Sequence, residues 1–86
     1  MTAWPAWWDW ELELTPHVER RMEDRDFTEV DLRAMLEAAV GFRADVIDGR
    51  FVIDTRHGSA RWEVIVEPDP MDSLLVVITA YQVTEG

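Results

Sequence analysis

The sequence predicts an α+β domain in which two N-terminal helices pack on a twisted, mainly antiparallel sheet, in the order β-α-α-β-β-β-β. Three observations predict this fold. Residues 8–14 alternate apolar and acidic side chains, residues 15–41 combine helix-start signals with helical spacing, and residues 43–83 form apolar runs separated by turns. A chain of 86 residues makes one domain. Residues 1–7 are its tryptophan-rich arm, 8–83 its globular core and 84–86 its tail.

The charge and composition restrict the function. The net charge of −10 opposes non-specific attraction to nucleic-acid phosphates and anionic membranes, although it also serves solubility. The absence of cysteine excludes disulfides and thiolate metal sites and fits a cytoplasmic protein. The N-terminus lacks the basic and apolar regions of a secretory signal. The longest apolar run, near residues 74–81, is too short to span a bilayer.

The arm and the first strand are rich in tryptophan. Trp4 and Trp7 of the arm either fold onto the chain's own core or anchor a homodimer or another partner, since tryptophan is enriched at interface centres. The stretch Trp8–Leu14 predicts a half-buried strand with acidic residues on its outer face. Such outward acids protect an edge strand from unwanted pairing. A metal site is not expected there, because no histidine or second acidic cluster joins them.

Thr15 and Pro16 predict the start of the first helix, as a hydroxyl N-cap followed by proline at the first helical position. The helix is expected to run to about Arg25, with Val18 and Met22 as a thin apolar stripe. Three residues spaced by four share an adjacent face of this helix: His17, Arg21 and Arg25.

Thr28 predicts the N-cap of the second helix, with Asp31 at the capping-box position and Phe27 packing on Leu32 as a hydrophobic staple. Gly41 is the expected C-terminal stop of this helix. Apolar residues at helical spacing form its core-facing stripe: Leu32, Met35, Leu36, Ala39 and Val40.

The rest of the chain predicts an antiparallel meander. Its expected strands are 43–47, 50–55, 60–67 and 74–83, with a loop at 68–73. Asp48-Gly49 indicates a two-residue hairpin turn, and His57-Gly58-Ser59 forms the next turn. The last strand is nearly all apolar and β-branched, which predicts a central strand covered on both faces. Apolar surface on the second face of the sheet would favour a homodimer.

One pattern in the chain resembles a known family. It reads His17-Val18-Glu19-Arg20-Arg21-Met22, then Arg25-Asp26-Phe27-Thr28, then a helix ending near Gly41, and strands closing on Val77-Ile78-Thr79-Ala80-Tyr81. This pattern resembles the small bacterial domain of unknown function 4258 over residues 12–83. That family is similar to the RelE/ParE toxin superfamily, which implies two helices packed on a small antiparallel sheet.

The resemblance also implies functions. Some members of the RelE/ParE superfamily are ribosome-dependent or free ribonucleases, others poison gyrase, and each is neutralised by a partner antitoxin. This chain departs from such toxins, which are usually basic, because it has no lysine and is strongly acidic. The tryptophan-rich arm is outside the pattern. The family has no assigned chemistry that can be carried onto the histidine of this chain.

The first functional hypothesis is a metal-independent RNA endonuclease toxin. RNA cleavage without a metal needs a group that activates the 2′-hydroxyl, and histidine suits that role near neutral pH. Arginine suits the crowded phosphate through its bidentate fork. The catalytic candidates are His17, Arg21 and Arg25, with Arg20, Arg61 and Tyr81 as secondary candidates. Arg50, Arg56 and His57 are further strand or turn residues that could converge on them. No cofactor or metal is expected.

The second hypothesis is a non-catalytic protein-interaction module on the same fold, or an acidic mimic of nucleic acid. In this case His17 hydrogen-bonds a strand carbonyl, and Arg21 and Arg25 pair with nearby acids such as Asp24 to join helix to sheet. Tyr81 is then a packed residue with a satisfied hydroxyl group. The hypotheses differ in their partners, which are RNA and an antitoxin for the toxin and another protein for the module.

Overall fold

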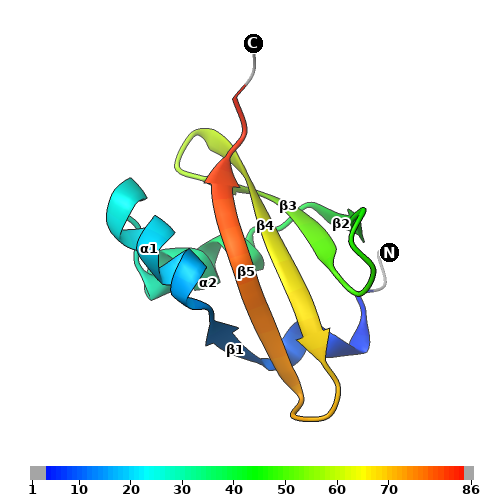
Figure 1. Ribbon diagram of the computed structural model, residues 1–86. Helices are drawn as coiled ribbons and strands as arrows, with labels where there is room; N and C mark the ends of the chain where they lie inside the picture. Colours follow the sequence, from blue (N-terminus) through cyan, green and yellow to red (C-terminus); the bar gives the residue numbers. More distant parts are fainter. Residues whose placement is uncertain (1–3, 85–86) are drawn as a thin grey trace.

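The structure is a computed structural model and describes residues 4–84. Two helices lie on one face of a five-stranded sheet (Figure 1), which confirms the α+β class and the predicted order of elements. The helices are α1 (Pro16–Arg25) and α2 (Glu29–Glu37). The strands are β1 (Glu11–Leu14), β2 (Gly41–Ala44), β3 (Phe51–His57), β4 (Ala60–Asp69) and β5 (Leu74–Gln82). A 3₁₀ helix, η1 (Ala6–Asp9), precedes β1.

The strands are arranged in the order β1-β5-β4-β3-β2. The strands β2 to β5 form an antiparallel meander, as expected, whereas β1 pairs in parallel with β5 at one edge. The parallel register places Leu12 beside Leu75 and Leu14 beside Val77. The apolar side chains of β1 therefore extend the same apolar face as those of β5, and its acids lie on the other face.

Side-chain caps start both helices at the predicted residues. The Thr15 hydroxyl accepts a hydrogen bond from the Val18 N–H at 3.3 Å and donates to the Val77 carbonyl oxygen at 2.8 Å. These bonds tie the start of α1 to β5. Thr28 and Asp31 form the capping box of α2, with bonds of 2.9 and 3.2 Å. The Thr28 N–H also lowers the pKa of the Asp31 carboxyl group.

The core lies between the helices and the sheet. Val18 of α1 and Leu32 of α2 are fully buried, and both belong to one cluster with Ile53 of β3. Phe27, between the helices, packs edge-to-face on Trp62, with ring centroids 5.3 Å apart. Because both helices are short, this packing rather than intrinsic helix propensity stabilises them.

The second helix ends earlier than the sequence predicts. It ends at Glu37, and Gly41 is the first residue of β2 rather than a helix stop. Val40 was expected in the core but is 73% exposed. Its N–H donates to the Asp54 carbonyl oxygen at 2.8 Å and so leads the chain into the pairing of β2 with β3. Sheet pairing here outweighs the helical periodicity, which is only a local signal.

The first strand is shorter than predicted. Trp8 and Asp9 belong to η1, in which the Trp8 N–H donates to the Pro5 carbonyl oxygen at 3.0 Å. The turn is followed by β1 from Glu11 onward, and half-buried and exposed residues alternate over residues 8–14, from the end of η1 through β1. The alternation therefore predicted which side chains face the core, but not where the strand begins.

Two of the predicted connections differ from the structure. Residues 45–50 join β2 to β3, so both strands end before the predicted two-residue connection, and a 2.9 Å bond from the Asp45 N–H to the Arg50 carbonyl oxygen closes this longer loop. The turn at Asp48-Gly49 itself forms, with the Arg50 N–H donating to the Ile47 carbonyl oxygen at 3.2 Å and Gly49 at a φ of 85°. The strand β4 continues to Asp69, so residues 68 and 69, which were predicted as the start of a loop, belong to the strand. The turn after His57 is confirmed.

The last strand is central in the sheet, but helices cover only one of its faces. Leu75, Val77 and Ala80 are buried toward the helices, whereas Val76 and Tyr81 are only half-buried on the other face. The prediction of a strand covered on both faces is therefore wrong. We call this second face, on which no helix of residues 4–84 lies, the open face.

Candidate functional site

The primary catalytic candidates lie on α1. His17 and Arg25 are exposed and Arg21 is half-buried, and the secondary candidate Arg20 is exposed beside them. Among residues 4–84, none of these side chains forms an ion pair, and His17 makes no hydrogen bond to a strand carbonyl. The pairing of Arg21 and Arg25 with nearby acids, expected for a structural role, is therefore absent within that part of the chain.

The secondary candidates Arg61 and Tyr81 lie on the open face. Each alternates with a residue buried beneath the helices, Trp62 on β4 and Ala80 on β5. The helix α1 packs against β5 from the opposite side, through the core cluster (Figure 1). The sheet therefore separates Arg61 and Tyr81 from His17, and the structure does not bring the candidates together.

A row of residues crosses the open face in register: Gly41 of β2, Asp54 of β3, Glu63 of β4 and Tyr81 of β5. Arg43 donates from Nη1 to the Asp54 carboxylate at 2.5 Å and from Nη2 to the Glu63 carboxylate at 2.9 Å. The Tyr81 hydroxyl donates to Glu63 Oε1 at 2.5 Å. We call Arg43, Asp54, Glu63 and Tyr81 the open-face network.

The network sets the ionisation of its members. The hydrogen bond to the Glu63 carboxylate raises the pKa of Tyr81 to about 12. The same bond lowers the pKa of the Glu63 carboxyl group, and Arg43 adds to that effect. Near neutral pH, Tyr81 is therefore neutral and Glu63 is ionised, so neither exchanges protons readily. The network is suited to holding four strands together and not to acid–base catalysis.

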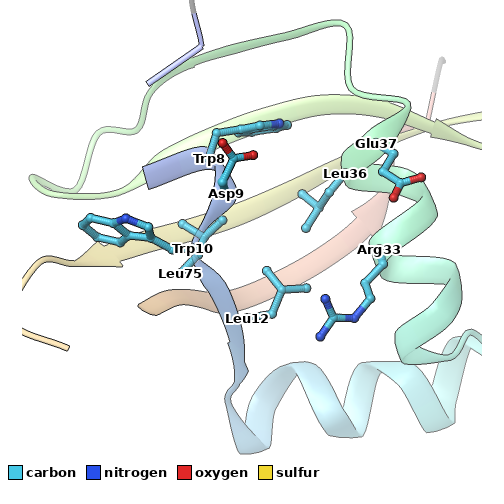
Figure 2. Close-up of a pocket in the computed structure, with 8 residues that line it drawn as sticks. All are labelled: Trp8, Asp9, Trp10, Leu12, Arg33, Leu36, Glu37 and Leu75. Atoms are coloured by element: carbon cyan, nitrogen blue, oxygen red, sulfur yellow. The ribbon is translucent and has the colours of Figure 1, made fainter. Parts of the chain in front are cut away.

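A groove lies between the N-terminal segment, α2 and β5 and has a volume of about 310 Å³. Figure 2 shows Leu12, Leu36 and Leu75 between its walls, with Arg33 and Glu37 projecting from α2. We call this site the tryptophan groove. Its lining residues are Trp8, Asp9, Trp10, Leu12, Arg33, Leu36, Glu37 and Leu75.

The sequence indicated only one wall of this groove. The tryptophan-rich stretch drew attention to Trp8 and Trp10, but nothing in the sequence connected them with Arg33 or Glu37 on the second helix. The two walls face each other because β1 pairs with β5 and thereby lies beside α2 (Figure 2). Non-local strand pairing of this kind has no short-range sequence signal.

The N-terminal arm folds onto the chain's own sheet and supports the groove. The Trp4 ring stacks on Trp8 with centroids 4.3 Å apart and lies 5.4 Å from Phe42. The Trp7 ring lies 5.1 Å from Phe51. These contacts correspond to the first of the two roles considered for the arm, since they use the tryptophan rings within one chain. Residues 1–3 of the predicted arm lie outside the described residues.

A second cavity, of about 340 Å³, lies at the end of the β3–β4 hairpin. We call it the arginine cavity. Its lining residues are Arg56, Ser59, Ala60, Arg61, Gln82 and Val83. Arg56 and Arg61 are directly opposite each other in the register of β3 and β4. The adjacent His57 is on the other face, where its ring meets Trp62 edge-on at 5.6 Å.

Within residues 4–84, no group of three or more histidine, aspartate or glutamate side chains gathers closely enough to hold a metal ion. The helices in that range are all too short or too polar to cross a membrane.

The fold and its cavities define a two-layer α+β domain with one open sheet face. The chain belongs to the family described as Domain of unknown function (DUF4258), whose model matches residues 14–82. No curated protein and no solved structure matches the chain. Membership of the family predicted from the helix-1 pattern is thus confirmed, while the likeness to RelE/ParE toxins stays a prediction.

Proposed function

We propose that this chain is a protein-interaction module whose tryptophan groove binds a basic segment of a partner protein through an inserted apolar side chain. The observation that carries the proposal is a groove of about 310 Å³ in which tryptophan and leucine side chains lie beside exposed acidic residues, on a chain of net charge −10. Ligand pockets usually measure about 300–1,000 Å³. A groove at the lower end of that range suits one side chain of a bound segment better than a large cofactor.

The lining of the groove favours a protein partner. Trp8 and Trp10 are half-buried, so each ring keeps surface that a partner would cover. Tryptophan combines a large apolar area with one N–H donor, which is why it is enriched at interface centres. An apolar side chain placed against Leu12 would leave water at a gain of about 25 cal/mol per Å².

The rim selects the charge of the partner. Asp9 and Glu37 are exposed carboxylates at the groove, whereas Arg33 is paired with Glu29 at 3.4 Å, which offsets its charge. A basic segment complements these carboxylates and the net charge of the whole chain. Such complementarity raises association rates and disfavours acidic partners.

The proposal is tested with a synthetic probe, an amphipathic peptide of leucine and lysine at helical spacing. We expect it to shift the indole N–H signals of Trp8 and Trp10 in a ¹H–¹⁵N spectrum. A peptide of the same length with glutamate in place of lysine is expected to leave them unchanged, because it meets an acidic rim. Equal binding of both peptides, or binding that leaves both signals in place, contradicts the proposal.

Two charge-reversal variants distinguish the effect of the rim carboxylate on binding from the effect of the net charge. Glu37→Arg changes the groove, and Glu23→Arg makes the same change in net charge at an exposed position of α1. We expect Glu37→Arg to weaken binding of the lysine peptide about two- to tenfold, in line with the energies of exposed ion pairs. Equal weakening by Glu23→Arg would mean that only the net charge matters.

A second candidate function is metal-independent RNA cleavage at α1. The observation that favours it is that His17, Arg21 and Arg25 form no ion pair with any residue in the range 4–84, so their charges are available to a phosphate. Histidine is the side chain best suited to activating a 2′-hydroxyl near neutral pH, and His17 is exposed. If the chain is a toxin of this kind, a partner antitoxin is expected.

Incubation of the purified protein with RNA in the presence of a metal chelator tests this candidate. Cleavage is expected to fall about 10²- to 10⁴-fold in His17→Ala, as for loss of a general base. The exposed position of His17 makes this variant safe for the fold. Intact RNA after prolonged incubation with the unmodified protein contradicts RNA cleavage and leaves the groove proposal unaffected.

A further inference from the structure

We infer that the arginine cavity binds the phosphate group of a small phosphorylated molecule. The inference does not depend on the tryptophan groove, because the two cavities share no lining residue. It rests on the placement of two arginines by one tight turn, on the polar groups that surround them and on the volume of the cavity.

The β3–β4 hairpin places the two arginines side by side. Gly58 and Ser59 form the turn, and Gly58 has a φ of 63°, a left-handed conformation that glycine adopts without strain. The resulting register sets Arg56 directly opposite Arg61, with both side chains exposed on the same face. Like charges directly opposite each other on neighbouring strands destabilise a sheet. A bound dianion would reverse the sign of that interaction.

The cavity offers several donors to one anion. The Arg56 guanidinium group can donate two parallel hydrogen bonds to phosphate oxygens. The Ser59 hydroxyl and the Gln82 carboxamide line the same cavity and can donate to the remaining oxygens. The Val83 N–H donates to the Arg61 carbonyl oxygen at 2.8 Å, which holds the end of β5 against β4 and keeps this wall in place. A volume of about 340 Å³ accommodates a phosphate group with a small attached moiety.

Glu63 and Asp54 on the open face belong to the open-face network. Glu63 accepts hydrogen bonds from Tyr81 and Arg43, and Asp54 accepts one from Arg43. Arg61 also acts on Glu63 and contributes to lowering the pKa of that carboxyl group. Arg56, which forms no ion pair within residues 4–84, therefore supplies the bidentate fork of the proposed site, and Arg61 lies opposite it in the register.

The test is a titration of the full chain with inorganic phosphate at constant ionic strength, followed through the arginine Nε–H signals and the Ser59 amide signal. We expect the signals of Arg56 and Ser59 to shift in a saturable manner. Arg56→Gln is expected to weaken binding about tenfold or more, since it removes charged hydrogen bonds. Arg50→Gln removes the same charge from the β2–β3 connection, outside the cavity, and is expected to change the affinity by less than about twofold.

Two further probes distinguish the sources of the phosphate. A mononucleoside monophosphate is expected to bind at least as tightly as inorganic phosphate. An RNA oligonucleotide without terminal phosphates is expected to bind more weakly, because its phosphodiesters carry one charge each. Tighter binding of the oligonucleotide overturns the assignment to small molecules. Absence of saturable shifts with phosphate, or equal shifts with chloride, overturns the site itself.

Discussion

The two faces of the sheet are stabilised by different interactions. Between the helices and the sheet, Leu32 of α2 and the strand residues Ile53 and Val64 are fully buried. On the open face, ion pairs and one tyrosine hydroxyl link four strands through Arg43 and Glu63. Burial of apolar surface provides most of the folding free energy, whereas half-exposed ion pairs each contribute little. The helix-covered face therefore determines stability, and the open face is the one that can change charge without loss of the fold.

The two cavities lie in different parts of the molecule. The tryptophan groove opens beside β1 and α2, and its lining combines tryptophan and leucine side chains with the acids Asp9 and Glu37. The arginine cavity lies at the hairpin end of the sheet and is lined by basic and polar groups. The two cavities thus differ in the charge of their linings, with exposed carboxylates at the groove and two arginines at the hairpin end. The following predictions test the contrast between the two faces, from the largest effect to the smallest.

Leu32→Ala should cause the largest loss of stability. The Leu32 side chain is 0% exposed, so its truncation leaves a cavity and is expected to cost about 2–5 kcal/mol of unfolding free energy. Val30, on the same helix, is 76% exposed, and Val30→Ala should change stability by less than about 0.5 kcal/mol. Urea denaturation of both variants measures the difference. Similar effects at the two positions would show that α2 does not pack through Leu32.

Thr55→Val tests the one polar residue that is buried among residues 4–84, which joins the two layers. The Thr55 hydroxyl, on a residue that is 3% exposed, donates to the Met35 carbonyl oxygen in the last turn of α2. Valine has nearly the same shape but leaves that carbonyl group unpaired, at an expected cost of about 1–3 kcal/mol. Thr55→Ser keeps the hydroxyl and should lose less. If serine is as destabilising as valine, the methyl group and not the hydrogen bond is what matters.

Tyr81 should titrate with a midpoint of about 12 instead of the ordinary 10.0. Tyr81 is the one tyrosine of the chain, so ultraviolet absorbance at high pH reports it directly. Because the folded pKa is raised, its stabilising effect is present below pH 10 and lost as the pH rises toward 12. Glu63→Gln should move the midpoint back toward 10.0. An unshifted midpoint in the unmodified chain would mean that the hydrogen bond to Glu63 does not form in solution.

Glu63 should show the opposite dependence. Its folded pKa is lowered, so the stabilisation that it provides is present above the ordinary value of 4.5 and lost as the pH falls through the folded value. Urea denaturation across the acid range measures this loss. The slope should be smaller in Tyr81→Phe, because the largest cause of the lowered pKa is then absent. An identical slope in both proteins would assign the acid sensitivity to other carboxylates.

Arg50→Gln should have the smallest effect. Arg50 Nε lies 3.2 Å from Glu67 Oε1, and the two side chains are 30% and 45% exposed. Ion pairs this exposed contribute about 0.2–1 kcal/mol, and added salt weakens them. The difference between Arg50→Gln and the unmodified protein should therefore shrink in high salt. A salt-independent loss above that range would mean that the open face contributes more to stability than its exposure suggests.

Local signals in the sequence predicted the starts of both helices. Thr15 and Thr28 are side-chain caps within three residues of the groups they bind, so short-range chemistry is sufficient to identify them. The end of α2 was missed because Val40 and Gly41 fit a helix locally but pair with β3 through Asp54, which lies beyond the β2–β3 connection. The turn at Asp48-Gly49 forms as its local signal predicts, but the length of the connection around it, residues 45–50, depends on the pairing of β2 with β3.

For the candidate site, too, the sequence predicted local features and missed those that depend on distant parts of the chain. The spacing of His17, Arg21 and Arg25 correctly indicated one helix face, because four residues complete about one turn. It gave no information on whether Arg61 and Tyr81 lie beside that face. Their side chains are on the far side of the sheet, since strand residues alternate between faces and α1 crosses only one of them.

The sequence by itself determined the class of fold, the two capped helices and the family to which the chain belongs. Periodicity and capping act over a few residues and can be read along the chain. Only the tertiary structure decided that β1 lies beside β5, which builds the tryptophan groove, and that Arg56 faces Arg61. These contacts join residues distant in sequence or depend on strand register, which is set by packing of the whole sheet.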